Sequence, residues 1–289
     1  MNKKKLLVVL SILLLLFVVS GCSIPTDEQG HFIQITDETT FQYMMDNEGF
    51  FAAIFVYPLS KIINYVAGAT GNVGLAILII TVAINAIILV LTLKQNISMQ
   101  RMQAIQPELE RIQRKYEGRE DQASKMRMAQ EMQNLYSKNK INPLGSMLVM
   151  FIQFPVIIAM YHAVQRSSAV ATGTFLGISL EKTPIEGIQG GQFVYLILFA
   201  LMLVAQIGSM LIPQKLAQRR AKMEAEKHHR PYRKTSNPMQ SSMYVMMAVV
   251  LLLGITWPTA MSFYWMISSC VNIVKSFIVD AISARSKEA

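Results

Sequence analysis

Residues 74–93 have the sequence GLAILIITVAINAIILVLTL, which contains no charged residue. A helix needs about 20 apolar residues to cross a hydrocarbon core of about 30 Å. Four further apolar stretches approach or reach this length, so the sequence predicts spans at 73–93, 143–165, 192–212, 239–257 and 258–279. The fourth is short and is joined to the fifth through Trp257 and Pro258, which favours a two-helix hairpin. The fold class expected is an all-α integral membrane protein, a bundle of five transmembrane helices.

The distribution of positive charge predicts the orientation of these spans. Ten Lys and Arg residues lie between the first and second spans, eight between the third and fourth, and two in the tail 280–289. The opposite side has only Lys61, Arg166 and Lys182. Because cytoplasmic loops carry the excess of Lys and Arg, the N-terminus is expected outside and the C-terminus in the cytoplasm. The net charge of +9 therefore needs no specific nucleic-acid binding, although it would favour anionic lipid headgroups or a ribosome.

A leader precedes the first span. Three lysines at 3–5 are followed by an apolar run and by Val19-Ser20-Gly21-Cys22. A basic start followed by an apolar run is typical of a secretory signal. Small residues before a cysteine suggest the lipoprotein form of this signal, so residues 1–21 are expected to be removed and Cys22 to carry lipid. The alternative is an uncleaved anchor helix with an incidental cysteine. Cys270 lies inside an apolar span, so the two cysteines offer no disulfide.

Two outer segments lie between the leader and the first span. Residues 22–49 are predicted to be an extracellular tether, because the stretch from Ser23 to Glu48 has six acids and no Lys or Arg. Residues 50–72 are apolar and aromatic, but Pro58 interrupts them and Lys61 lies among them. If they crossed the membrane, the ten positive charges after the first span would lie outside. An amphipathic helix in the outer interface is therefore predicted, and residues 166–191 are expected as a second extracellular loop.

Residues 94–142 predict a cytoplasmic helical hairpin. Apolar residues recur at coiled-coil spacing before Gly118, and a second helical stretch follows it. Flexible thioether side chains suit surfaces that meet varied apolar partners, so Met99, Met126 and Met128 are predicted to form a docking surface. Met102 and Met132 are expected to pack the two helices together instead.

The second cytoplasmic loop, 213–238, is basic. Its adjacent histidines, His228 and His229, are more often solvated than metal-bound, and no cysteine or acidic cluster completes a metal site.

Neutral polar residues recur within the predicted spans, and no Asp or Glu lies in the middle of any of them. Polar groups in hydrocarbon usually face the bundle interior or water. The set therefore predicts a hydrated concavity without a fixed ion site. For any single residue, hydrogen bonding between helices for packing alone is an equal alternative. The residues are Thr81, Asn85, Gln153, His162, Gln206, Ser268, Ser269 and Asn272.

The order of motifs along the chain resembles the YidC/Oxa/Alb family of membrane protein insertases, in the lipoprotein form found in Gram-positive bacteria. Each motif is modest alone, but their joint order and spacing are specific, and the resemblance extends from about residue 50 to residue 279. The motifs are NVGLA at 72–76, LKQNISM at 93–99, MQAIQPE at 102–108, NPLG at 142–145, QFP at 153–155 and FYW at 263–265.

This resemblance implies a hydrophilic groove that is open to the cytoplasm and to lipid and closed outside. It implies nascent membrane proteins as substrates, the Sec translocon and the ribosome as further partners, and neither catalytic residues nor cofactors. The polar residues assigned to the groove on this basis are Thr81, Asn85, Gln153, Gln206, Tyr264, Trp265 and Asn272.

The chain departs from the family pattern at three positions. Asn85 stands where the family usually has an arginine, Val90 replaces a proline, and Lys275 replaces a frequent glutamine. An asparagine can hydrogen-bond to a substrate but cannot attract an acidic one, so substrates with weakly charged tails are expected. Lys275 is a candidate substitute for the missing cation.

Three other functions stay open from the residues alone. One is a specialised assembly factor without autonomous insertion, and another is a structural lipoprotein scaffold. A small-solute transporter subunit would predict inverted repeats or intramembrane ionisable pairs, and neither is evident.

Overall fold

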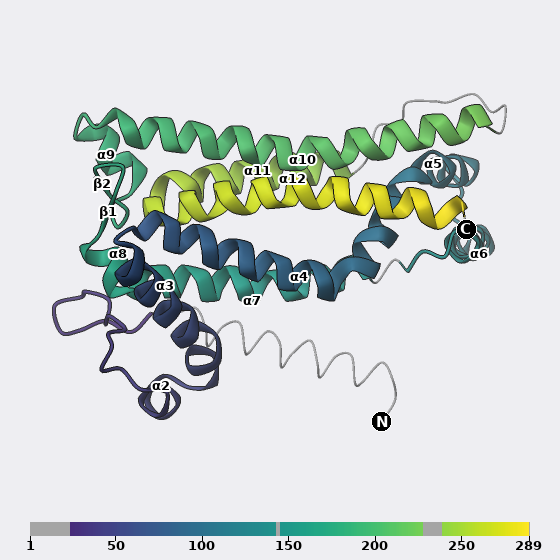
Figure 1. Ribbon diagram of the computed structural model, residues 1–289. Coiled ribbons are helices and arrows are strands. Elements are labelled where there is room, and N and C mark those ends of the chain that lie inside the picture. The colour runs from purple at the N-terminus through teal and green to yellow at the C-terminus, as the bar shows by residue number, and fades with distance from the viewer. Residues whose placement is uncertain (1–23, 143–144, 228–238, 289) are drawn as a thin grey trace. The chain divides into compact units, whose positions relative to one another are not determined.

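The computed structural model describes residues 24–142, 145–227 and 239–288, which are almost entirely helical (Figure 1). This confirms the all-α class. The elements in chain order are α2 (Phe41–Glu48), the π-helical segment η1 (Ala52–Val56), α3 (Tyr57–Thr70), α4 (Val73–Ala104), α5 (Gln106–Lys115), α6 (Gln122–Lys138), α7 (Gly145–Arg166), α8 (Ser168–Thr172), β1 (Thr174–Phe175), β2 (Ile178–Ser179), α9 (Pro184–Gln189), α10 (Phe193–Lys227), α11 (Met239–Thr256) and α12 (Thr259–Glu288).

The predicted spans correspond to α4, α7, α10, α11 and α12. Within the described residues, four helical stretches are long and apolar enough to cross a membrane: Ala52–Thr70, Val73–Met102, Phe193–Met223 and Thr259–Ser283. A shorter apolar helix covers Met247–Thr256, and α7 has 22 residues. By length and composition, Ala52–Thr70 could also cross a membrane. The interfacial placement of 50–72 therefore stays a prediction, based on its proline, its lysine and the charge count.

Helix α10 is longer than the span predicted from hydropathy. The sequence predicts a loop from residue 213, but the helix continues through Pro213 to Lys227. The residues after Pro213 are mostly Lys, Ala, Gln, Arg and Glu, which are strong helix formers, so the helix continues despite the hydrogen bond that proline cannot donate. The remainder of the predicted loop, with His228 and His229, lies outside the described residues.

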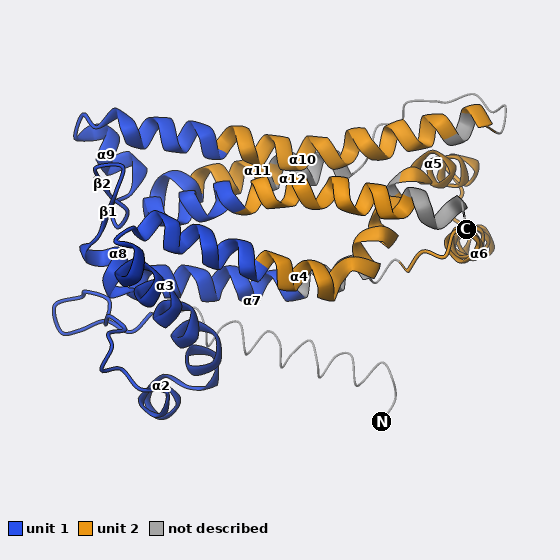
Figure 2. Ribbon diagram, in the orientation of Figure 1, with its two compact units in different colours: residues 1–84, 152–202, 253–267 blue, residues 85–151, 203–252, 268–289 orange. Residues whose placement is uncertain are grey.

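The chain divides into two compact units, shown in Figure 2. Unit 1 contains residues up to 84, 152–202 and 253–267, and unit 2 contains 85–151, 203–252 and 268–289. The long helices α4, α10 and α12 each begin in unit 1 and end in unit 2. The two units differ in what fills their interiors.

Unit 1 has a close-packed apolar core. Six of its α-helices contribute apolar side chains with no exposed surface: Met44, Ile63, Ile77, Met160, Met202 and Met261. The antiparallel strands β1 and β2 pack onto this core: the Phe175 ring lies 4.9 Å from that of Phe263, measured between centroids. The same ring covers Gly74, where a Cβ would come within 2.2 Å of it. Glycine at this position therefore permits the close approach.

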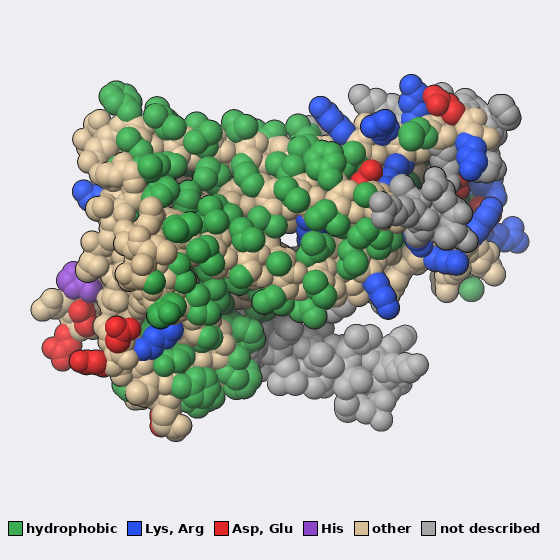
Figure 3. Space-filling view, viewed as in Figure 1, with side chains coloured by type: hydrophobic (Ala, Val, Ile, Leu, Met, Phe, Trp, Pro, Cys, Tyr) green, Lys and Arg blue, Asp and Glu red, His purple; other side chains and the backbone are tan. Residues whose placement is uncertain are grey.

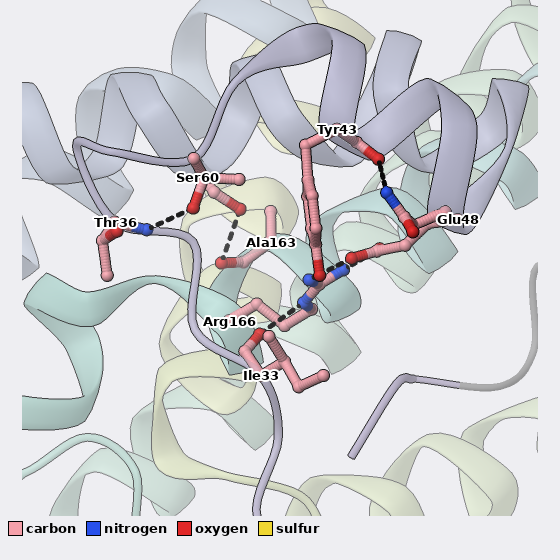
Figure 4. A network of polar contacts seen from close by, with 9 residues as sticks. Ile33, Thr36, Tyr43, Glu48, Ser60, Ala163 and Arg166 are labelled. Carbon is pink, nitrogen blue, oxygen red and sulfur yellow. Dashed lines mark hydrogen bonds and ion pairs between the residues drawn. The ribbon is translucent and has the colours of Figure 1, made fainter. Parts of the chain in front are cut away.

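The predicted tether is docked onto unit 1 by a buried ion pair (Figure 4). The Arg166 guanidinium pairs with both carboxylate oxygens of Glu48, at the end of α2, and donates from Nε to the Ile33 carbonyl at 2.7 Å. Arg166 is 1% exposed and the Glu48 side chain 8%. The Ile35 amide in turn donates to the Arg166 carbonyl at 2.7 Å. The ion pair therefore fixes the N-terminal segment, α2 and the end of α7 together.

A single asparagine of α3 holds the same segment from the other side. Asn64 donates from Nδ2 to the Ile35 carbonyl at 2.7 Å and accepts from the Ser167 hydroxyl at 2.6 Å. Its Oδ1 also accepts from the Ala169 amide at 3.1 Å. The segment predicted as an exposed tether is thus tied, around Ile35, to both α3 and α8.

Candidate functional site

Helix α4 has a stripe of polar side chains on one face. Thr81, Asn85, Thr92, Asn96 and Gln100 follow at steps of seven or four residues, which keep them on neighbouring parts of the helix surface. Thr81 and Thr92 have no exposed surface, and Asn85 is 6% exposed. Both threonine hydroxyls donate at 2.6 Å to carbonyls one turn earlier. The buried part of the stripe therefore faces protein.

Sequence reasoning found only the first two members of this stripe. It placed residues beyond 93 in the cytoplasmic hairpin, whereas α4 runs on to Ala104. The helical spacing of Thr92, Asn96 and Gln100 with Asn85 is the signal that would have revealed them.

In unit 2, α12 makes polar contacts with both α10 and α4. The Ser269 hydroxyl donates to Gln206 Oε1 at 2.7 Å. Further along, Gln100 donates to the Ser276 carbonyl, and its own Oε1 accepts from the Ser283 hydroxyl, both at 3.4 Å. Polar groups therefore join three helices of unit 2. Of the predicted groove residues, the structure gives Gln206 a partner on another helix.

Unit 2 has three further polar side chains to consider: Asn272, Lys275 and Gln95. Lys275 is half-buried on α12, one turn after the half-buried Asn272. Among the described carboxylates, none lies within 4.0 Å of Lys275, whereas Arg220 and Asp280 pair with each other. The Oε1 of Gln95 is buried and accepts no hydrogen bond from the described residues. Unit 2 thus has a half-buried cation with no carboxylate within 4.0 Å and a buried acceptor with no partner, both among the described residues.

Four of the predicted groove residues belong to unit 1: Thr81, Gln153, Tyr264 and Trp265. The two aromatic ones lie in its core. Tyr264 is 1% exposed. Trp265 stacks on Trp257 with ring centroids 5.4 Å apart, and Trp257 lies 4.3 Å from the Tyr161 ring. Gln153 is half-buried on α7. A groove that joins these residues to those of unit 2 stays a prediction.

The hairpin of α5 and α6, in unit 2, has a small core of its own. Met102 and Met132 pack against the cluster of Ile105, Leu109 and Ile141, which confirms their expected packing role. Of the predicted docking residues, Met126 is 68% exposed, and Met99 and Met128 are half-buried.

An ion pair crosses the hairpin. Glu131 of α6 accepts from Lys115 Nζ at 2.6 Å and from the Tyr116 hydroxyl at 2.8 Å. These two hydrogen bonds lower the pKa of the Glu131 carboxyl, and the bond to Glu131 raises the pKa of Lys115. Lys and Arg side chains gather around this hairpin and the end of α10 (Figure 3). The hairpin is therefore a basic surface with an exposed methionine.

Comparison with known proteins identifies the family. Residues 65–286 match the family model described as 60Kd inner membrane protein. The membrane protein insertase YidC 2 of Bacillus anthracis is 32% identical over 99% of this chain and 98% of its own length. MisCA of Bacillus subtilis, also a membrane protein insertase, is 32% identical over 81% of this chain and 80% of its own. YidC of Alkalihalophilus pseudofirmus is 30% identical over 95% of this chain and 94% of its own.

These matches extend over nearly the whole chain and include both units with the polar stripe of α4. Together with the long apolar helices, they establish a multi-pass membrane protein. The chain belongs to the 60Kd inner membrane protein family, whose relatives are named YidC membrane protein insertases.

Proposed function

We propose that this protein is an insertase and chaperone that moves nascent membrane proteins from the cytoplasm into the bilayer. The observation that carries the proposal is the set of polar contacts that joins α4, α10 and α12 within unit 2. The names of its relatives support the same activity. Insertion of this kind needs no covalent step.

The physical problem that such a protein solves is the dry path across the membrane. Each unsatisfied backbone group in hydrocarbon costs several kcal/mol. Polar side chains that reach partway into the bilayer shorten that path and offer temporary hydrogen-bond partners to a polar tail. The hydrophobic segment that follows partitions into lipid, with a gain of about 0.8 kcal/mol per buried CH2. Gln95, Gln206 and Asn272 would be the partners of the tail.

The same proposal assigns an orientation and an anchor. With twenty Lys and Arg residues on one side and three on the other, the end of unit 2 that holds the hairpin would face the cytoplasm. There its basic surface and Met99, Met126 and Met128 would meet anionic lipids, the ribosome or the Sec translocon. Cys22, the predicted lipid anchor on the outer side, lies outside the described residues.

Lys275 would set the preference for tail charge. The family position for a cation on α4 is Asn85 in this chain, which is buried and polar but uncharged. Lys275 is the half-buried cation of α12 and has no carboxylate within pairing distance among the described residues. A tail with one or two acidic residues would find this cation, whereas a strongly acidic tail would exceed its capacity.

Insertion into purified proteoliposomes tests the proposal. Single-span substrates with a short outer tail, either neutral or acidic, are scored by protease protection with wild type, Asn85→Arg, Lys275→Gln and empty liposomes. Wild type should protect the neutral-tailed substrate above empty liposomes. Asn85→Arg should raise insertion of the acidic tail, and Lys275→Gln should lower it without changing the neutral one.

Two results would contradict these assignments separately. If wild type gave no protection while a relative worked in parallel, autonomous insertion would be refuted and an assembly role favoured. If Asn85→Arg and Lys275→Gln left acidic-tailed substrates unchanged, the charge preference would be wrong, although the insertase assignment would stand.

A further inference from the structure

Unit 1 contains an open cavity of about 790 Å3 that the insertion mechanism does not use. Its walls are the second half of α3, the start of α4, helix α8 with the first residue of β1, and the loop residue Asp37. Helices α3 and α8 lie side by side here (Figure 1). Small residues of α3, including Ala67, Gly68 and Ala69, keep the space open.

The lining consists mainly of small and apolar residues, among which a few polar side chains are placed. None of its residues is Lys, Arg or His, and its one charged member is the exposed Asp37. Ser168, Thr172 and Thr174 contribute hydroxyl groups. Helix α3 ends here at Gly71, in a left-handed conformation with φ of 65°, and α4 begins at Val73. The partial charges of these two helix ends have opposite signs, so the Asp37 carboxylate decides the charge of the cavity. The cavity therefore favours a positively charged group that donates hydrogen bonds.

A fixed cation lies beside this cavity. Lys61 Nζ donates to the Asp37 backbone carbonyl at 2.7 Å and lies 5.6 Å from the centre of the Tyr57 ring. These contacts hold the ammonium at the edge of the cavity and leave the Asp37 carboxylate without an ion pair among the described residues. A cavity that offers a carboxylate and hydroxyl groups next to a held cation matches a zwitterion, with its positive end at Asp37 and its anionic group at Lys61.

The surroundings indicate that the zwitterion belongs to a lipid. Tyr65, which lines the cavity, is 77% exposed, and the neighbouring Ile62 is 42% exposed. Both lie on the stretch Ala52–Thr70, which is apolar enough to contact a membrane. An aromatic ring can also attract a cation through its face. Exposed apolar side chains beside a zwitterion site provide the surface that an acyl chain needs.

We propose that this cavity binds the headgroup of a phospholipid with a primary ammonium, with the ammonium at Asp37 and the phosphate at Lys61. The site is independent of the insertase assignment, because none of its residues takes part in the polar contacts of unit 2. It would make unit 1 sensitive to the aminophospholipid content of its leaflet.

The test is lipid retention by the purified full-length protein, measured by native mass spectrometry with phosphatidylethanolamine or phosphatidylcholine. The two lipids share the phosphate, but the trimethylated ammonium of phosphatidylcholine donates no hydrogen bond. Wild type should retain phosphatidylethanolamine about tenfold better, which corresponds to about 1.4 kcal/mol. Asp37→Asn should abolish the preference, and Glu38→Gln, the exposed acid next in sequence, should keep it.

A steric variant gives a second test that leaves the charges unchanged. Gly68 is exposed and a Cβ there would meet no atom within 4 Å, so the side chain of Gly68→Leu begins in open space at the cavity wall. It should lower retention of phosphatidylethanolamine to that of phosphatidylcholine while the helical circular dichroism stays that of wild type. Equal retention of both lipids by wild type, or equal behaviour of Asp37→Asn and Glu38→Gln, would overturn the proposal. Displacement by a free-amine peptide but not by phosphoethanolamine would overturn it in favour of a polypeptide terminus.

Discussion

At the scale of single residues, the stability of unit 1 depends on a few side chains whose replacement should destabilise the fold. Arg166 and Glu48 are both buried, and their charges are compensated by each other and by the Ile33 carbonyl. A buried pair stabilises little relative to an apolar pair, but removal of one partner leaves the other charge uncompensated. The losses of stability from mutating the two residues should therefore not be additive.

We predict that Arg166→Gln or Glu48→Gln alone destabilises the protein by about 3–5 kcal/mol, and that the double variant recovers much of this loss. The measurement is the thermal unfolding midpoint in detergent, followed by the helical circular dichroism signal. If the losses of the two single variants simply added in the double variant, the two side chains would act independently. The proposed coupling between them would then be refuted.

Gly74 offers a second residue-scale prediction. Gly74→Ala places a methyl group 2.2 Å from the Phe175 ring, which is itself packed on Phe263. Overpacking of this kind typically costs about 1–3 kcal/mol. Gly68→Ala is the matched control, because its Cβ meets nothing and alanine is the better helix former. Unfolding midpoints should fall for Gly74→Ala and hold or rise for Gly68→Ala; equal midpoints would mean that Phe175 moves aside at no cost.

At the scale of elements, long apolar windows were sufficient to predict the spans and insufficient to predict where the helices end. Long uncharged stretches predicted α4, α10 and α12, but each helix continues well beyond its apolar window into polar sequence. A hydropathy window stops at the membrane edge, whereas helix propensity does not. The polar stripe past residue 93 was missed for this reason.

The docking of the predicted tether could not be predicted from the sequence, for a different reason. Its contacts join Ile35 to Asn64 and Arg166, residues separated by more than twenty positions, and no local pattern reports such pairs. Acidic composition suggested an exposed segment, and most of residues 24–48 are exposed, but Ile35 and Met44 are buried and Glu48 pairs with Arg166. The cavity beside α3 depends on the same long-range assembly.

The hairpin of α5 and α6 carries a prediction on pH. The pKa of Glu131 is lowered by hydrogen bonds from Lys115 and Tyr116, so its stabilising contribution is present above the unfolded value near 4.5 and is lost as pH falls through the folded value. Spin labels at the exposed Gln113 and Gln133 should give a narrow distance distribution at pH 7 that broadens below pH 4. Glu131→Gln should give a distribution that is broader at pH 7 and changes less between these values. Glu117→Gln, which removes an exposed acid of the turn, should give the same distance distributions as wild type at both pH values. If Glu131→Gln also gave the wild-type distributions, the role of this ion pair would be disproved.

At the scale of the whole molecule, we propose that the two units have different roles in insertion. Unit 1 buries apolar and aromatic side chains of six α-helices, whereas unit 2 joins three of its helices through amides and hydroxyls. In this proposal, the apolar core of unit 1 would resist water and the polar contacts of unit 2 would admit it. Insertion requires water to enter from one side only, so the difference between the units matters more than any one side chain in them.

Cysteine accessibility tests this division on a single helix. In a Cys270→Ser background, Asn272→Cys places a thiol in unit 2, and Ser262→Cys places one ten residues earlier in unit 1, where serine is 1% exposed. A membrane-impermeant maleimide added to inverted vesicles should label Asn272→Cys because water reaches it from the cytoplasmic side. It should label Ser262→Cys only after denaturation, and neither thiol should react in intact cells. Labelling of Asn272→Cys from the outer side instead would reverse the proposed orientation, and equal labelling of both positions would show that water crosses both units.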